Sequence, residues 1–150
     1  MISRFEQFSF VISGIYRYIQ KLERDEMIKY GYKGAYAQYL AALARFPEGL
    51  TCAKLCTICD KDKAAVSRII AEMEQKGLVV RRGDNERLYK APVFLTEEGR
   101  RTAAYVQERA RVAVDAANPD MTEEERQAFY HALDRIAARL HALTREGIPE

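Results

Sequence analysis

Apolar residues recur every three or four positions along most of the chain, which is the spacing of one face of an α-helix. This pattern predicts helices over residues 4–29, 35–46, 51–59, 62–76 and 96–118, and a last helix that begins after Thr122. Residues 77–82 and 87–95 are instead typical of two strands, and the Gly-Asp-Asn-Glu sequence between them is typical of a turn. The expected fold class is therefore mostly α with a small two- or three-stranded β-wing (α+β).

The segment 62–76 carries the clearest pattern. Asp62 is a good N-cap for it, and Gly77 can end it in the left-handed conformation. Its apolar stripe consists of Val66, Ile69, Ile70 and Met73. Its opposite face consists of Ala64, Ser67, Arg68 and Ala71. Three of these four outer residues are small, whereas a purely solvated helix face normally carries long Glu and Lys side chains.

Such a face favours contact with another surface. Small residues allow a close approach, and the Arg68 guanidinium suits a phosphate or the edge of a guanine. Lys63 adds a second cation in the first turn. For this helix taken alone, an ordinary amphipathic helix with an alanine-rich exterior is an equal alternative. The flanking segments favour the first interpretation.

Those flanks complete a winged helix-turn-helix. Thr51 can cap a short helix that ends near Cys59, and residues 60–61 then form a tight link into Asp62. The hairpin that follows carries the basic residues Arg81, Arg82, Arg87 and Lys90. A basic wing beside a small-faced helix fits a DNA duplex, with the helix in the major groove and Arg87 at a phosphate or the minor groove.

The order of these motifs resembles that of the MarR family of bacterial transcriptional regulators. The resemblance rests on Asp-Lys-Ala-Ala-Val-Ser-Arg at 62–68, Lys-Gly-Leu-Val at 76–79, the basic wing and Leu-Thr-Glu-Glu-Gly at 95–99. The outer helices also match in place and length. The resemblance implies a homodimeric repressor or activator that binds a pseudo-palindromic operator and is often released by a small ligand or by oxidation.

We therefore predict a single MarR-like domain over residues 1–150, with double-stranded DNA as a partner of the winged helix-turn-helix module at 35–99. Residues 50–95 hold nine Lys and Arg against six Asp and Glu, so we expect modest non-specific affinity for DNA. The residues predicted to contact DNA are Thr51, Lys54, Lys61, Asp62, Lys63, Ala64, Ser67, Arg68, Arg81, Arg82, Asn85, Arg87 and Lys90.

Both ends of the chain, residues 1–34 and 100–150, predict dimerisation helices. Apolar residues there alternate steps of three and four, which is a heptad-like pattern. They are Phe5, Phe8, Ile12, Ile15 and Ile19 near the N-terminus, and Phe129, Leu133, Ile136, Leu140 and Leu143 near the C-terminus. A two-fold dimer in which the terminal helices of both chains interleave would bury these seams. We therefore predict a homodimer.

Tyrosines gather in the first two helices, and Tyr16, Tyr36 and Tyr39 are candidates for an effector pocket. In one interpretation this pocket binds a small phenolic or other organic effector, because the MarR resemblance places effectors in this region. The favoured alternative is packing at an amphipathic interface, since tyrosine has an apolar body and a hydroxyl that needs a partner when buried.

Cys52, Cys56 and Cys59 fall near one face of the helix at 51–59. Cys52 is the candidate redox residue, since it lies nearest the helix start, where exposure and a lowered pKa are expected. A metal site is disfavoured, because three ligands on one helix cannot easily surround a tetrahedral ion. The favoured interpretation is that these small side chains fill the contact between two short helices.

The sequence gives no indication of an enzyme. His131 and His141 have no nucleophile in a recognisable motif beside them, there is no glycine-rich phosphate loop, and we expect no cofactor and no metal. Arg4 and Glu6 interrupt the N-terminus, which therefore does not resemble a signal peptide. No run approaches a transmembrane span, so we expect a cytoplasmic protein without a membrane partner.

Two alternatives to a DNA-binding regulator stay open. One is a winged-helix module that binds other proteins and not DNA. The other is a thiol sensor whose chemistry lies at Cys52. The first predicts no salt-dependent binding to a duplex, and the second predicts that an oxidant, rather than an organic molecule, releases DNA.

Overall fold

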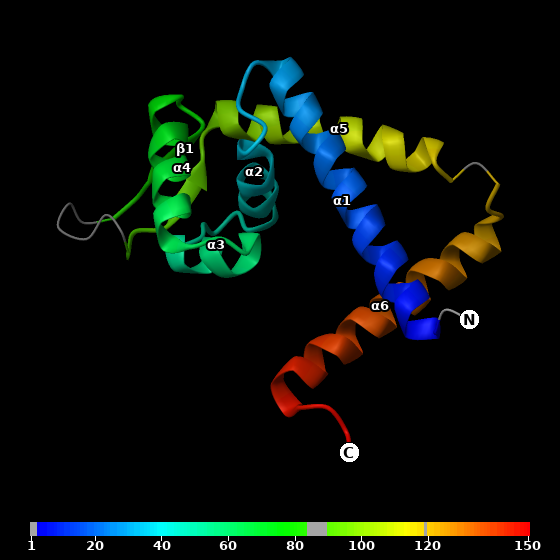
Figure 1. Cartoon of the computed structure of the whole chain (residues 1–150). Helices are drawn as coiled ribbons and strands as arrows, with labels where there is room; N and C mark the ends of the chain where they lie inside the picture. The colour runs from blue at the N-terminus through cyan, green and yellow to red at the C-terminus, as the bar shows by residue number, and fades with distance from the viewer. Residues whose placement is uncertain (1–2, 84–89, 119) are drawn as a thin grey trace. The chain divides into compact units, whose positions relative to one another are not determined.

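The structure is a computed structural model that describes residues 3–83, 90–118 and 120–150. Its elements are α1 (Arg4–Tyr30), α2 (Tyr36–Arg45), α3 (Cys52–Cys59), α4 (Lys63–Gln75), β1 (Val79–Arg81), β2 (Val93–Leu95), α5 (Glu97–Ala116) and α6 (Glu123–Glu146) (Figure 1). The chain divides into two compact units, residues 1–113 and 114–150. The predicted fold class, mostly helical with a small wing, is confirmed.

Side-chain caps fix the starts of the helices. The Thr51 Oγ1 accepts a hydrogen bond from the Lys54 N–H at 3.3 Å, and the Asp62 Oδ1 accepts one from Ala65 at 2.7 Å. Both caps were predicted, and each satisfies a backbone donor that the first helical turn leaves unpaired. Between α3 and α4, Asp60 adopts a left-handed conformation, with φ of 52°. This conformation makes the short turn of the helix-turn-helix.

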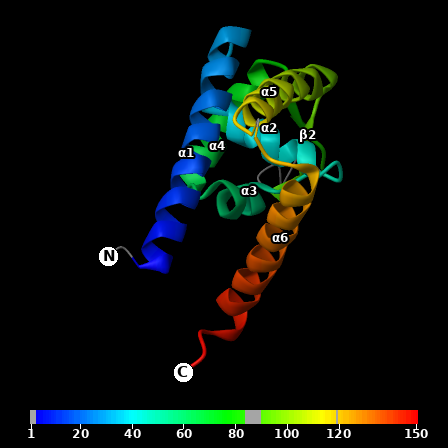
Figure 2. The same cartoon turned by 90° about the vertical axis from the view of Figure 1, so that its right-hand side faces the viewer.

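The core of the first unit lies under α4. Val66, Ile70 and Met73 are fully buried, together with Leu55 of α3 and Leu40 of α2. Helix α2 contacts both α1 and α3, so it connects the long first helix to the helix-turn-helix (Figures 1 and 2). Burial of each large aliphatic side chain contributes about 1.5–3 kcal/mol, so this cluster holds α4 firmly to the body of the unit.

The wing is an antiparallel pair in which Val79 faces Leu95 and Arg81 faces Val93. An isolated bridge between Leu50 and Val93 adds a third chain segment beside β2. Both strands are shorter than predicted. Residues 77–78 instead close α4, because Gly77 takes φ of 75° and the Leu78 N–H donates to the Met73 carbonyl.

The start of α5 is attached to the end of α4 through one hydroxyl. Thr96 Oγ1 donates to the Gly77 carbonyl at 2.6 Å and accepts from the Gly99 N–H at 3.0 Å. The predicted cap at Thr96 is therefore confirmed, and it also ties the wing to the helix-turn-helix.

The second unit consists of the end of α5 and of α6. Thr122 and Glu125 form the predicted capping box, with hydrogen bonds of 3.1 and 2.9 Å. No residue of α6 is buried. Within the described residues, no helix combines the length and apolar character needed to cross a membrane.

Candidate nucleic-acid interface

The outer face of α4 is open to solvent. Ala64, Ser67, Arg68 and Ala71 are all exposed, whereas the apolar stripe on the opposite side is buried. The two-sided pattern predicted for this helix is confirmed. The exposed face is formed by small side chains around one guanidinium, so a flat or convex surface can approach its backbone closely.

A carboxylate on α4 is held by the first residue of α2 and by a lysine of the loop before that helix. Lys33 Nζ lies 2.9 Å from Glu72 Oε2, and the Tyr36 hydroxyl donates to the same oxygen at 3.0 Å. The hydrogen bond from Lys33, and then that from Tyr36, lowers the pKa of Glu72 below its ordinary value. Burial, followed by the contact with Glu72, raises the pKa of Tyr36 to about 12. This cluster fixes one edge of α4, and no motif in the sequence predicts it.

The basic residues of the wing differ in their surroundings. Arg81 is half-buried, and its Nε lies 2.8 Å from Glu74 Oε1, an ion pair without the alignment of a hydrogen bond. Arg82 is exposed, and its guanidinium lies over the Phe94 ring, 5.1 Å from the centroid. Lys90 is exposed. Asn85 and Arg87 lie outside the described residues.

The remaining predicted contacts lie around α3 and the turn after it. Lys54, Lys61 and Lys63 are exposed, and Thr51 is half-buried. The carboxylate of Asp62 caps α4, so this residue acts on the start of the helix. Exposed cations therefore flank the N-terminal end of α4, from which a groove-reading helix usually contacts bases.

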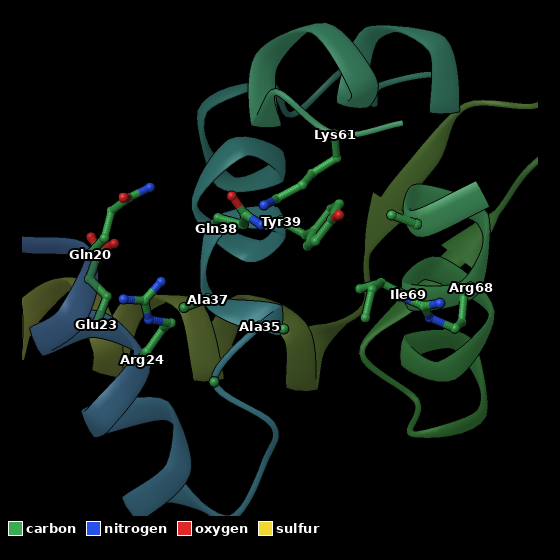
Figure 3. Close-up of a pocket in the computed structure, with 12 residues that line it drawn as sticks. Gln20, Glu23, Arg24, Ala35, Ala37, Gln38, Tyr39, Lys61, Arg68 and Ile69 are labelled. Carbon is green, nitrogen blue, oxygen red and sulfur yellow. The ribbon is translucent and has the colours of Figure 1, made fainter. Parts of the chain in front are cut away.

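A pocket of about 300 Å³ lies beside this face, between α1, α2 and α4. Figure 3 shows Glu23 and Arg24 of α1, Tyr39 of α2, and Arg68 of α4 around it, with Lys61 from the preceding turn. Burial raises the pKa of Glu23. Basic and acidic groups are therefore both present in its lining, and Arg68 belongs both to the pocket and to the exposed face.

Of the three tyrosines considered for an effector pocket, only Tyr39 lines this one. Tyr36 is 1% exposed and directs its hydroxyl to Glu72, and Tyr16 is 62% exposed. The structure therefore does not bring the three together around one pocket among the described residues. Helix α1 also contributes two polar residues to this pocket, Glu23 and Arg24, that were not predicted. Helical periodicity does not identify which polar position of a long helix faces a neighbouring element.

The prediction that Cys52 is exposed with a lowered pKa is wrong. Cys52 is only 7% exposed, and burial raises its pKa. The reason is that Cys52, the first residue of α3, lies on the face of the helix that packs against the core. Leu55, about one turn later on the same face, is 0% exposed. Burial likewise raises the pKa of Cys59 to about 11, and its Sγ lies 4.0 Å from the Gln38 carbonyl oxygen. These cysteines pack between helices, as the favoured interpretation proposed.

The predicted dimerisation residues are largely solvent-exposed in each unit. On α1, Phe5, Phe8, Ile12 and Ile15 are exposed and Ile19 is half-buried. On α6, Phe129, Ile136 and Leu140 are exposed, whereas Leu133 and Leu143 are half-buried. Each terminal helix thus presents an apolar seam.

Comparison with known proteins identifies the module that carries α4. Residues 30–87 match the family model described as "MarR family". The crystal structure of a MarR-family transcriptional regulator from Silicibacter pomeroyi has 26% identity and a TM-score of 0.74, with 92% of each chain covered. Residues 30–87 are therefore a MarR-family module, and the whole chain has the MarR fold.

Two further structures extend the likeness in fold. The crystal structure of MarR itself has a TM-score of 0.79 at 22% identity, covering 97% of this chain and 99% of that one. The crystal structure of a MarR-family protein from Listeria monocytogenes in complex with 26mer DNA has a TM-score of 0.70 at 20% identity, covering 93% of this chain and 94% of that one. No curated protein sequence matches the chain. The chain thus has the fold of MarR-family transcriptional regulators along nearly its whole length.

Proposed function

We propose that this chain is a sequence-specific DNA-binding transcriptional regulator. The observation that carries the proposal is the two-sided α4, whose apolar stripe is buried while Ala64, Ser67 and Arg68 remain exposed. Each protomer would insert α4 into the major groove, with Lys63 and Arg68 at base edges or nearby phosphates. The Listeria protein of the same fold, whose crystal structure is a complex with DNA, supports this mode of use.

The other predicted contacts surround this helix. Thr51 and Ser67 would bind phosphates, and Arg82 and Lys90 would follow the backbone beside the wing. Arg87, which lies outside the described residues, is proposed for the adjoining minor groove. Residues 35–99 would form the DNA-binding module of a single functional domain. The protein would act by binding, without a catalytic step, as expected for a cytoplasmic regulator.

The working form would be a homodimer on a pseudo-palindromic operator. The exposed apolar seams of α1 and α6 support this, because an apolar surface of that kind is normally buried against a partner. Two-fold symmetry would place the two α4 helices about 34 Å apart, which is one turn of DNA. The terminal helices of both chains would set this separation.

Release from DNA would follow from binding of a small organic molecule. The pocket beside α4 supports this, since Arg68 belongs to both the pocket and the exposed face. An occupant that redirected Arg68 would weaken binding to the operator, and the protein would then act as a repressor. Release by oxidation at Cys52 is less well supported, because the thiol is buried and its pKa is raised.

Duplex binding tests the proposal directly. Duplexes selected from a random pool by the wild-type protein would be titrated by fluorescence anisotropy at several salt concentrations. Arg68→Ala should weaken specific binding by about 1–3 kcal/mol if the guanidinium contacts a base. The matched control is Arg45→Ala, which removes an exposed arginine from the end of α2.

Two results would contradict this function. If no duplex were enriched and binding showed no dependence on salt, the winged-helix module would have to bind another kind of partner. If Arg68→Ala and Arg45→Ala had equal affinities, Arg68 would not be a base contact.

A further inference from the structure

Helix α4 carries two carboxylates, and a cation from outside the helix pairs with each of them. Glu72 lies 2.9 Å from Lys33 Nζ, which comes from the loop before α2. Glu74 lies 2.8 Å from Arg81 Nε on β1. The acidic end of the helix is thus neutralised by residues of other elements. The pair at Glu72 bears more directly on DNA, because Glu72 follows Arg68 by about one helical turn.

Arg68 and Glu72 are neighbours on the surface of α4. Residues four positions apart in a helix lie on one face, with Cβ atoms about 6 Å apart, so an arginine and a glutamate at this spacing can form an ion pair. The hydrogen bond from Lys33 is the first cause of the lowered pKa of Glu72, that from Tyr36 is the second, and the charge of Arg68 makes a smaller contribution. The two side chains are therefore close, yet Arg68 forms no ion pair with any residue that the structure describes.

Other donors already occupy the Glu72 carboxylate. Lys33 Nζ and the Tyr36 hydroxyl bind the same oxygen, Oε2, at 2.9 and 3.0 Å. Tyr36 is buried and therefore fixed in place, whereas the side chain of Lys33 is 65% exposed. The charge of Lys33 can consequently be removed by substitution without disturbing the core.

We propose that Lys33 is a positioning residue for DNA binding, which keeps the Glu72 carboxylate away from Arg68 and so leaves the Arg68 guanidinium available to the duplex. The proposal deepens the function proposed above and rests on it for the contact between Arg68 and DNA. Lys33 acts through Glu72 and not by touching DNA itself.

Removal of the Lys33 charge changes the partner of Glu72. The carboxylate then keeps only the hydrogen bond from Tyr36, and the guanidinium of Arg68 is the cation one turn away on the same helix. A charge-assisted bond between the two forms at the expense of the contact with DNA, because the guanidinium must leave the carboxylate before it can bind a base or a phosphate. Duplex binding therefore weakens although no residue that contacts DNA has been changed.

Duplex titration of a lysine pair tests this effect. Measured by fluorescence anisotropy on the selected duplex, Lys33→Met should weaken binding by about twofold to fivefold, the scale of one helical ion pair. Lys29→Met is the matched control, since Lys29 is also exposed, at 67%, and pairs with Glu26 of its own helix at 3.0 Å. Lys29→Met should bind as the wild type does. An equal loss in the two variants would be an effect of net charge and would overturn the proposal.

Double variants separate the indirect role from a direct contact. Lys33→Met should cause no further weakening in an Arg68→Ala protein or in a Glu72→Gln protein, because one partner of the competing ion pair is then missing. If Lys33→Met cost the same factor in these two backgrounds as in the wild type, Lys33 would contact the duplex itself, and the positioning role would be overturned.

The exchange of partners can also be measured without DNA. A ¹³C NMR titration of the Glu72 carboxyl group in the full chain gives its pKa in each variant. Arg68→Ala should raise the pKa of Glu72 more in the Lys33→Met protein than in the wild type, because Arg68 binds the carboxylate only when Lys33 does not. Equal rises in the two backgrounds would overturn the proposal.

The two measurements keep the proposed function and the role of Lys33 distinct. If the wild-type protein bound no duplex, the proposed function would fail, and the NMR titration would still decide whether Lys33 keeps Glu72 from Arg68. If Arg68 replaced Lys33 at the carboxylate but Lys33→Met bound the duplex as tightly as the wild type, the role of Lys33 in DNA binding would be overturned while duplex binding itself stood.

Discussion

The Tyr36 hydroxyl donates a hydrogen bond to Glu72, with 3.0 Å between Oη and Oε2, and so joins α2 to α4. The tyrosine is buried, and Lys33 approaches the same carboxylate oxygen from the preceding loop at 2.9 Å. The orientation of α4, the helix proposed to enter the major groove, thus depends on a contact with a residue 36 positions earlier in the chain.

Tyr36→Phe should therefore reduce stability while leaving the fold intact. The change removes one hydrogen bond from a buried hydroxyl and keeps the ring, so we expect a loss of about 1 kcal/mol. Urea denaturation of the two proteins measures this difference. Tyr16→Phe is the control, because Tyr16 is exposed and should give an unchanged midpoint. A Tyr36→Phe protein as stable as the wild type would show that Lys33 alone holds Glu72.

Stability should also fall at alkaline pH. The pKa of Tyr36 is raised from 10.0 to about 12, which means that the unfolded chain releases this proton at lower pH than the folded protein. The contribution is complete below pH 10 and is lost as the pH rises towards 12. Free energies of unfolding measured across this interval should decline less steeply in Tyr36→Phe. A residual slope is expected, because burial also raises the pKa of Tyr39.

The buried thiols should react slowly in the folded protein. Cys52 is buried with a raised pKa, so little thiolate is available at neutral pH. Iodoacetamide labelling followed by tryptic mass spectrometry separates Cys52 from Cys56 and Cys59, since cleavage follows Lys54. We expect labelling of Cys52 to be much slower in buffer than in urea. Equal rates in the two conditions would restore Cys52 as a candidate sensor.

The features that could be predicted from the sequence are local ones. Thr51, Asp62, Thr96 and Thr122 cap the helices that follow them because capping joins residues three positions apart. The two faces of α4 follow from helical periodicity over a segment of thirteen residues. These observations were sufficient to predict the winged helix-turn-helix.

Contacts between distant segments could not be predicted in the same way. Glu72 meets Lys33 and Tyr36 only because α2 packs on the helix-turn-helix, and no short-range pattern encodes that pairing. The prediction for Cys52 failed for a related reason. Helix α3 has only eight residues, so periodicity alone left open which side of its first turn faces the core.

Gly99 should not tolerate a side chain. A Cβ at this buried position would overlap the Leu78 carbonyl, which belongs to the backbone and cannot move aside easily. Gly99→Ala should therefore destabilise the protein by about 1–3 kcal/mol or more. Gly14→Ala is the matched control, since a Cβ at this position of α1 would lie 3.8 Å from the Tyr18 ring, an ordinary van der Waals contact.

Thermal unfolding at equal concentration distinguishes the two glycines. Gly14→Ala should keep or raise the midpoint, because alanine favours the interior of a helix by about 0.5–1 kcal/mol over glycine. If both variants unfolded at the wild-type temperature, the approach of α5 to Leu78 would not be as close as the structure has it.

The apolar seam of α1 should be required for dimerisation. Ile12 is exposed at the centre of this seam, so Ile12→Asp should leave the core of the first unit intact while placing a charge in the proposed interface. Light scattering after size-exclusion chromatography should show twice the monomer mass of 17.2 kDa for the wild type and the monomer mass for Ile12→Asp. The control Arg17→Asp alters the opposite side of α1 and should remain dimeric. If the wild type were a monomer at micromolar concentration, two α4 helices could not be held one turn of DNA apart, and the proposed operator geometry would be wrong.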